Sequence, residues 1–187
     1  RQALFFRLQD DSASACAQLS ACLTLAEQWA GVSQEPVAVP YMEEAVLSFL
    51  RSCEVLTSDW KQMLEQAANA PEPENLLAYT PALDQEIRLF TMDMLYRYYL
   101  RAAYAETPEA EILPVQMAAF AVCIVLLYSR RLEFHTAEQR LRIWQLFVKE
   151  IEYDGDNLEE LEWQLETNAA FSPAAFRAYF ASLGGVQ

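Results

Sequence analysis

Only four of the 187 residues are glycine, at positions 31, 155, 184 and 185. Tight turns draw heavily on glycine and proline, and a β-sandwich of this length needs many of them. The eight prolines are too few to make up the shortfall. The sequence therefore predicts an all-α fold, and an apolar content of 53% indicates that the chain buries a core. We expect one domain over residues 1–187, a single bundle of about seven to nine helices.

The same scarcity of glycine limits the chemistry. A phosphate-binding loop needs backbone amides that are not shielded by side chains, and glycine provides them. Neither a G-x-G-x-x-G sequence nor a Walker loop can be written with these four glycines. A conventional dinucleotide-type fold for NAD or S-adenosylmethionine is therefore excluded.

Apolar residues recur at intervals of three and four, which is the period of an α-helix. Together with capping residues and prolines, these intervals set approximate helix boundaries. The first five predicted helices cover residues 2–9, 13–30, 41–55, 59–69 and 82–105. The remaining ones are an apolar helix that ends near Leu132, a helix that ends near Tyr153, a helix that ends near Thr167, and one between Ser172-Pro173 and Gly184-Gly185.

Candidate caps precede most of these helices. Thr136 and Gln139 match a capping box, and Gly31 suits the position just past a helix end. The apolar helix has Pro108 or Pro114 in its first turn. Caps are also predicted at Asp10, Asp11 or Ser12 for the second helix, at Thr57, Ser58 or Asp59 for the fourth, and at Asp156 or Asn157 for the one ending near Thr167. Two prolines mark residues 70–75 as a candidate hinge.

The most apolar run, from Ile112 to Tyr128, contains Pro114 and Gln116. It is slightly short for a membrane span, and we expect a buried central helix instead. The predicted partners therefore do not include a membrane.

The formal net charge is −14, which repels nucleic acid in the absence of a basic patch. Eight Asp and Glu residues lie between Glu150 and Glu166, a stretch without Lys or Arg. Such a run is typical of a solvated helix face, and it is also suited to docking a basic protein. We do not expect nucleic acid among the partners.

The four cysteines, Cys16, Cys22, Cys53 and Cys123, form no C-x-x-C pair. A zinc site needs close pairs or histidine partners, and His135 is the single histidine. We predict free buried thiols in a reducing cytoplasm and no metal site. His135 lies at a helix junction, where a surface or capping contact is a better interpretation than a catalytic base. We assign no catalytic residue.

The predicted helix over residues 82–105 carries an unusual run of tyrosine and arginine. A tyrosine ring attracts a cation through its face and offers a hydroxyl as well, which would suit a sulfonium or an amine. The simpler interpretation is a core helix with tyrosine hydroxyls at its rim. Asp93 and Arg97 are four residues apart and should form an ion pair. One face of the helix is predicted to carry Leu89, Met92, Tyr96, Tyr99 and Ala103.

Several stretches resemble the C-terminal part of the flagellin lysine-N-methylase family. They are Leu4–Asp10, Glu74–Leu77, Leu95–Leu100 and the run from Trp144 to Leu161. In the last run, Lys149-Glu150-Ile151-Glu152-Tyr153 and Asn157-Leu158 are similar to the family's "E-hydrophobic-E-H-S-x-x-N-L" pattern. Tyr153 and Asp154 stand where the family has His and Ser.

The resemblance implies methyl transfer from S-adenosylmethionine to lysine side chains of flagellin. It also implies an N-terminal cysteine-rich domain that holds an iron–sulfur cluster. No cluster ligand can be placed on this chain, which begins at Arg1, so we expect a fragment of a longer protein that is inactive alone. Predicted contacts with the substrate or the missing domain are Tyr96, Arg97, Tyr99 and Arg101.

Two other functions are compatible with the sequence. One is a non-enzymatic interaction module that uses the acidic residues 150–166 to bind a basic protein. The other is a helical ligand-binding domain with a pocket lined by Tyr and Met residues beside the 89–103 helix.

Overall fold

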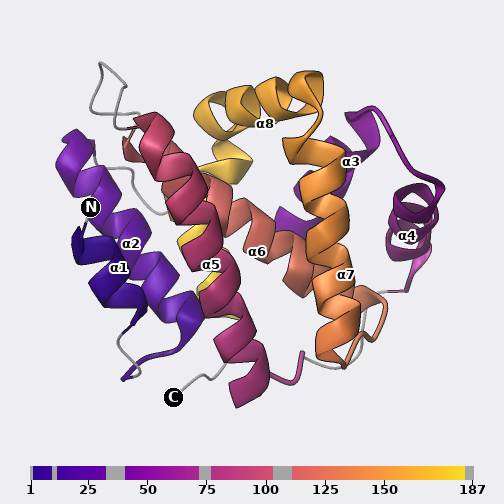
Figure 1. Ribbon diagram of the computed structural model, residues 1–187, viewed down its shortest axis with the longest axis horizontal. Helices are drawn as coiled ribbons and strands as arrows, with labels where there is room; N and C mark the ends of the chain where they lie inside the picture. Colours follow the sequence, from indigo (N-terminus) through magenta and orange to yellow (C-terminus); the bar gives the residue numbers. More distant parts are fainter. Residues whose placement is uncertain (1, 10–11, 33–40, 72–76, 103–110, 184–187) are drawn as a thin grey trace.

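The computed structural model describes residues 2–9, 12–32, 41–71, 77–102 and 111–183, and within these ranges the chain is helical and has no strand (Figure 1). The prediction of an all-α fold with about seven to nine helices is confirmed, because nine α-helices lie in the described ranges. The first five are α1 (Gln2–Leu8), α2 (Ala15–Ala30), α3 (Met42–Ser52), α4 (Ser58–Asn69) and α5 (Pro81–Ala102). They are followed by α6 (Leu113–Arg131), α7 (Ala137–Phe147), the π-helix η2 (Val148–Glu152), α8 (Gly155–Thr167), the 3-10 helix η3 (Ala169–Phe171) and α9 (Pro173–Ser182).

Helix α6 is the centre of the core. All residues from Pro114 to Ser129 are buried, and the helix packs against α2, α3, α4, α5, α7, α8 and α9. A helix surrounded on every side must be apolar all round, which explains why its sequence shows no polar face. By length and composition α6 is the one described helix that could cross a membrane, yet 89% of its apolar stretch is buried in the fold. The expectation of a buried central helix is confirmed, and Pro114 lies in its first turn. Pro108 lies outside the described residues.

Gln116 shows how this apolar helix accommodates a polar side chain. Its Nε2 atom donates to the carbonyl oxygens of Leu165, at 2.8 Å, and Phe171, at 3.0 Å. A buried amide without partners would be costly, so these bonds fix the chain around η3 against α6. The rings of Phe120 and Phe171 meet edge to face at 5.2 Å in the same region.

The two ends of the described chain meet at helix α2. Helix α2 packs against both α1 and α9, and Glu27 on α2 forms an ion pair with Arg177 on α9. Figure 1 shows α1 and α2 along one side of the molecule, next to α5. Residues from both ends therefore contribute to one continuous core.

Two residues of α5 fasten the segment that joins α1 to α2. The Oδ1 atom of Asp84 accepts a hydrogen bond from the backbone N–H of Ala15 at 2.6 Å, at the first residue of α2. Arg88 pairs with Asp84 at 2.9 Å and donates to the carbonyl oxygens of Leu8 and Ala13. Side chains of α5 thus bond the last carbonyl of α1, the first N–H of α2 and one carbonyl of the segment between them.

The start of α2 differs from the prediction. Ser14 is its N-cap and accepts from the N–H of Ala17 at 3.2 Å, so Ser12 does not cap this helix. Asp10 and Asp11 lie outside the described residues. Gly31 follows the helix in the left-handed conformation, with φ of 69°, as predicted.

Three further boundaries differ from the prediction. Helix α3 ends at Ser52 rather than near residue 55, and Val55 is exposed. After Phe147 the predicted α-helix continues as the π-helix η2. The cap of α8 is Asp154, which accepts from the N–H of Asn157 at 2.8 Å, and neither Asp156 nor Asn157 has this role.

Only part of the predicted face of α5 faces the core, because Tyr99 is buried while other members are exposed. Leu89 is 58% exposed and Tyr96 is 69% exposed. Apolar residues occupy two neighbouring stripes of this helix, and periodicity alone cannot choose between them. Packing against α2 and α6 selects the other stripe, which contains Leu83, Ile87, Met94, Leu95 and Tyr98. Ala103 and most of the candidate hinge at 70–75 lie outside the described residues.

Candidate functional site

Two segments that carry the family resemblance, residues 95–100 and 144–161, meet at one arginine. Arg97 on α5 forms an ion pair with Glu152 on η2 and a second one with Asp93, at 2.7 Å. The Glu152 side chain is 7% exposed, and that of Arg97 is 33% exposed. The predicted pair of Asp93 and Arg97 is confirmed, and the contact with Glu152 anchors η2 to the outer part of α5.

The four predicted contact residues do not form a single surface. Tyr96 is exposed, whereas Tyr99 is buried and its hydroxyl donates to Glu111 Oε2 at 3.0 Å. Arg97 is engaged in its two ion pairs. The backbone of Arg101 belongs to α5, and its side chain lies outside the described part of the structure. Of these residues, the structure leaves Tyr96 most open to a partner.

The π-helix η2 directs Glu150 inward. Its wider turn ends where the N–H of Tyr153 donates to the carbonyl oxygen of Val148 at 3.0 Å. Glu150 is fully buried, and its Oε2 atom accepts from the backbone N–H groups of Leu56, at 2.7 Å, and Thr57, at 3.3 Å. The Oε1 atom accepts from the hydroxyl of Thr57. Glu150 is a buried carboxylate whose hydrogen bonds compensate for part of its desolvation.

Asn157 completes this arrangement from the first turn of α8. Its Oδ1 atom accepts from the N–H of Glu54 at 2.8 Å. Its Nδ2 atom donates to the carbonyl oxygens of Glu54, at 2.9 Å, and Glu150, at 2.8 Å. We call Glu150 and Asn157, with the bonded segment 54–57, the latch. Two residues of the resembling pattern therefore serve to fix the connection between α3 and α4.

The acidic run from Glu150 to Glu166 is not a uniform surface. Glu150 is buried in the latch, Glu152 is paired with Arg97, and Asp154 caps α8. Four other carboxylates of the run are exposed on the outer side of α8: Asp156, Glu159, Glu160 and Glu166. The structure thus divides the run into three residues with internal roles, an exposed group of four on one helix, and the half-buried Glu162.

The four cysteines are buried and lie on different parts of the fold: Cys16 and Cys22 on α2, Cys53 after α3, and Cys123 on α6. Burial raises the pKa of Cys16 to about 11 and the pKa values of Cys22 and Cys53 to about 12. An iron–sulfur cluster is held by converging thiolates, and burial here disfavours the thiolate. In the described ranges, no group of three or more His, Cys, Asp or Glu residues is placed to hold a metal. These residues do not fit an iron–sulfur cluster.

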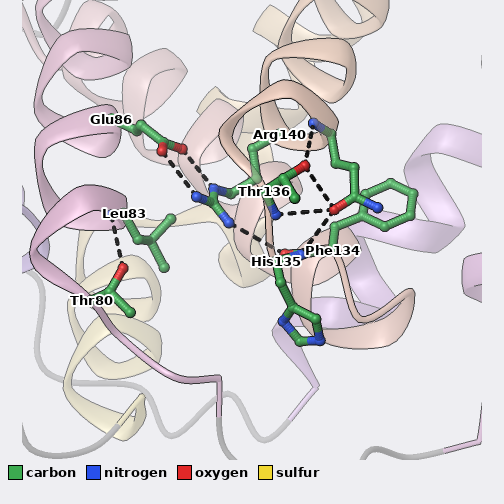
Figure 2. A network of polar contacts seen from close by, with 8 residues as sticks. Thr80, Leu83, Glu86, Phe134, His135, Thr136 and Arg140 are labelled. Atoms are coloured by element: carbon green, nitrogen blue, oxygen red, sulfur yellow. Dashed lines mark hydrogen bonds and ion pairs between the residues drawn. The ribbon is translucent and has the colours of Figure 1, made fainter.

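Figure 2 shows the junction between α6 and α7, where His135 lies. The Gln139 Oε1 atom accepts from the N–H groups of His135 and Thr136, both at 3.0 Å, and the predicted capping box is present. Arg140 pairs with Glu86 on α5 at 2.6 Å, and the imidazole points away from this network (Figure 2). His135 therefore contributes a backbone contact to the helix cap.

Comparison with known proteins provides no relative. No protein-family model, curated protein or solved structure matches this chain. The functional argument consequently depends on the contacts described above and on the resemblance of short segments.

Sequence reasoning missed the residues that do most to fix the fold. The structural roles of Glu150 and Asn157 were not predicted, nor were those of Asp84 and Glu43. Glu43 is buried and accepts hydrogen bonds from both Arg130, at 2.6 Å, and Arg131, at 3.1 Å. The sequence around Glu150 gave no signal of its burial, because Lys149 and Glu152 are charged neighbours of the same kind.

Proposed function

We propose that this chain is the helical C-terminal domain of a protein similar to flagellin lysine-N-methylases. The complete protein would transfer a methyl group from S-adenosylmethionine to lysine side chains of a protein such as flagellin. The described residues do not fit the iron–sulfur cluster of that family, so the cluster would belong to a separate cysteine-rich domain. In this proposal the helical domain positions the protein substrate or the cysteine-rich domain.

The observation that supports the proposal most is the meeting of the resembling segments. Residues 95–100 and 149–158 are about fifty residues apart in the sequence, and the ion pair of Arg97 with Glu152 joins them. Glu150 and Asn157 of the same pattern make the latch. Short patterns that arise by chance have no reason to meet in this way, whereas the signature of a folded domain does.

The geometry also suggests which residue of the helical domain makes contact. Tyr96 is 69% exposed and follows Leu95, which is fully buried, so the backbone beneath the exposed ring is firmly held. Large exposed aromatic side chains on rigid elements are common anchors of protein interfaces. We propose Tyr96 as the contact with the substrate protein or with the cysteine-rich domain.

The first test is the coding sequence upstream of Arg1. We expect a region with clustered cysteines, and a region without such a cluster would contradict the proposal. The second test is methylation of flagellin by the complete protein, purified without oxygen and supplied with S-adenosylmethionine. Mass spectrometry should find methylated lysines, and the isolated chain should give none.

Tyr96→Ala in the complete protein tests the proposed contact. We expect the KM for flagellin to rise, or the two domains to separate more readily in limited proteolysis. The matched control is Tyr41→Ala, because Tyr41 is a tyrosine of similar exposure, 66%, at the N-cap of α3. Equal behaviour of the two variants would remove Tyr96 from the contact while leaving the methylase proposal to be judged by the methylation assay.

A further inference from the structure

The outer side of α8 carries an exposed tryptophan among carboxylates. Trp163 is 56% exposed, although tryptophan is usually mostly buried. Glu159 and Glu160 precede it by four and three residues, and Glu166 follows it by three. Residues at these intervals are neighbours on a helix surface, with Cβ atoms about 5–6 Å apart. The indole ring is therefore flanked by carboxylates on both sides along the helix.

This face is turned away from the rest of the fold. Asn157, Leu161 and Leu165 are buried on the opposite side of α8, which packs against α6 and η2. Figure 1 shows α8 lying across one end of the molecule, at its edge. Trp163 is therefore not part of the described core, and core packing does not account for a large apolar ring at this position.

The carboxylates of this face have no basic partner among the described residues. Asp156, Glu159, Glu160 and Glu166 take part in no ion pair there, although Glu160 accepts a hydrogen bond from Gln164 at 3.0 Å. Seven arginines already form ion pairs with acidic residues on other elements: Arg88, Arg97, Arg130, Arg131, Arg140, Arg142 and Arg177. Among the described residues this face thus lies open to a positively charged partner.

The negative field of this region is visible in one neighbouring thiol. The pKa of Cys53 is raised to about 12, first by desolvation and then by the carboxylates of Glu160 and Asp154. Both carboxylates lie at the N-terminal part of α8, close enough to disfavour a second negative charge.

We propose that the outer face of α8, formed by Asp156, Glu159, Glu160, Trp163 and Glu166, binds a basic polypeptide segment. One lysine or arginine side chain lies on the indole ring of Trp163, and the carboxylates on either side bind the neighbouring positive charges. The carboxylates are spread over about 15 Å of helix rather than converging on one point. This spacing suits an extended chain with a basic residue at every second position, which repeats at about 7 Å, and not a single small cation.

The proposal does not depend on the methylase assignment, because any basic protein segment would satisfy it. The test uses the chain as it is, with a fluorescein-labelled peptide that has lysine at every second position as the probe. Binding is measured by fluorescence anisotropy at low and at physiological salt. We expect saturable binding that weakens as salt increases, and no binding of the same peptide with glutamine in place of lysine.

Two variants address the two parts of the face. W163A should weaken binding about two- to fivefold, the contribution of one cation–π contact at an exposed site. E159Q/E160Q/E166Q should weaken it about tenfold, because each exposed pair contributes a fraction of that change. Circular dichroism checks that the variants remain folded, which we expect because the substituted side chains are exposed.

Matched controls separate this face from the overall charge of −14. W29A removes another exposed tryptophan, 41% exposed and on α2, and E65Q/E133Q/E138Q removes three exposed carboxylates elsewhere. Neither should change the affinity by more than about twofold. The proposal is overturned if the control triple variant weakens binding as much as the α8 triple variant, or if W163A binds as tightly as the unmodified chain.

Discussion

Glu150→Ala should destabilise the fold more than any other single change at an acidic residue of the 150–166 run. The substitution removes the carboxylate that accepts three hydrogen bonds, from the N–H of Leu56, the N–H of Thr57 and the hydroxyl of Thr57. Glu150 is fully buried, so water can replace its carboxylate oxygens only in part. The free energy of unfolding should therefore fall substantially.

The magnitude follows from the three lost acceptors. Each donor left without a partner costs about 1–3 kcal/mol, and Leu56 and Thr57 are exposed enough for water to compensate for part of this cost. Removing the carboxylate also recovers the cost of its burial. We expect a net loss of about 2–4 kcal/mol, which is a large share of the stability of a typical domain.

Glu150→Gln is the conservative counterpart. The amide keeps the shape of the side chain, and its oxygen can accept from both backbone N–H groups of segment 54–57. The hydroxyl of Thr57 would face the amide nitrogen and accept from it, in place of its charge-assisted bond to a carboxylate oxygen. We expect a loss of about 1 kcal/mol for this variant.

Urea unfolding followed by circular dichroism measures both effects. A slope of about 2 kcal/mol per molar urea converts the expected loss for Glu150→Ala into a midpoint lower by about 1–2 M. Glu159→Ala is the matched control, because Glu159 is an exposed acid of the same run, and it should change stability by less than about 0.5 kcal/mol. The reasoning is refuted if Glu150→Ala unfolds at the midpoint of the control, or if Glu150→Gln is as damaging as Glu150→Ala.

Three further predictions concern other contacts. Thr136→Ala removes the hydroxyl of the capping box and should cost about 1 kcal/mol in urea unfolding, and an unchanged midpoint would show that the box is not stabilising. Asp84→Ala should cost about 2–3 kcal/mol and increase hydrogen exchange of the Ala15 amide, whose acceptor it removes; unchanged exchange would contradict the bond. The native pKa values of Cys22 and Cys53 are raised from 9.0 to about 12, so above pH 9 the unfolded chain releases thiol protons that the folded chain keeps. Stability should be intact below pH 9 and fall between pH 9 and pH 12. A variant with alanine at both cysteines should show a shallower fall, and an equal slope would count against raised thiol pKa values.

Local signals in the sequence predict a helix boundary where the capping group is a near neighbour. Thr136 and Gln139 are three residues apart, and Gly31 directly follows its helix, so both ends could be assigned. The start of α2 depends in addition on Asp84, 69 residues away, and no local pattern reveals such a partner. The end of α3 is fixed by Asn157, about a hundred residues later in the chain.

The candidate site was less predictable for a similar reason. Tyrosine and arginine at helical spacing indicated a face of α5, but two apolar stripes compete there and only packing decides which is buried. The structure turned Tyr96 outward and Tyr99 inward, although they are three residues apart. An acidic run likewise does not reveal which carboxylate is buried, and Glu150 and Glu159 have opposite environments.

The latch joins residues before Pro71 to residues after it in the chain. The ion pair of Glu27 with Arg177 and the contacts of Glu43 with α6 also connect these two parts. A cut in the backbone just after Pro71 would leave two pieces that recognise each other through these same bonds and a shared apolar interior. The chain is therefore suited to use as a split protein. Two polypeptides, produced separately, would assemble into one folded unit when they meet, and folding would then be the signal that they have met.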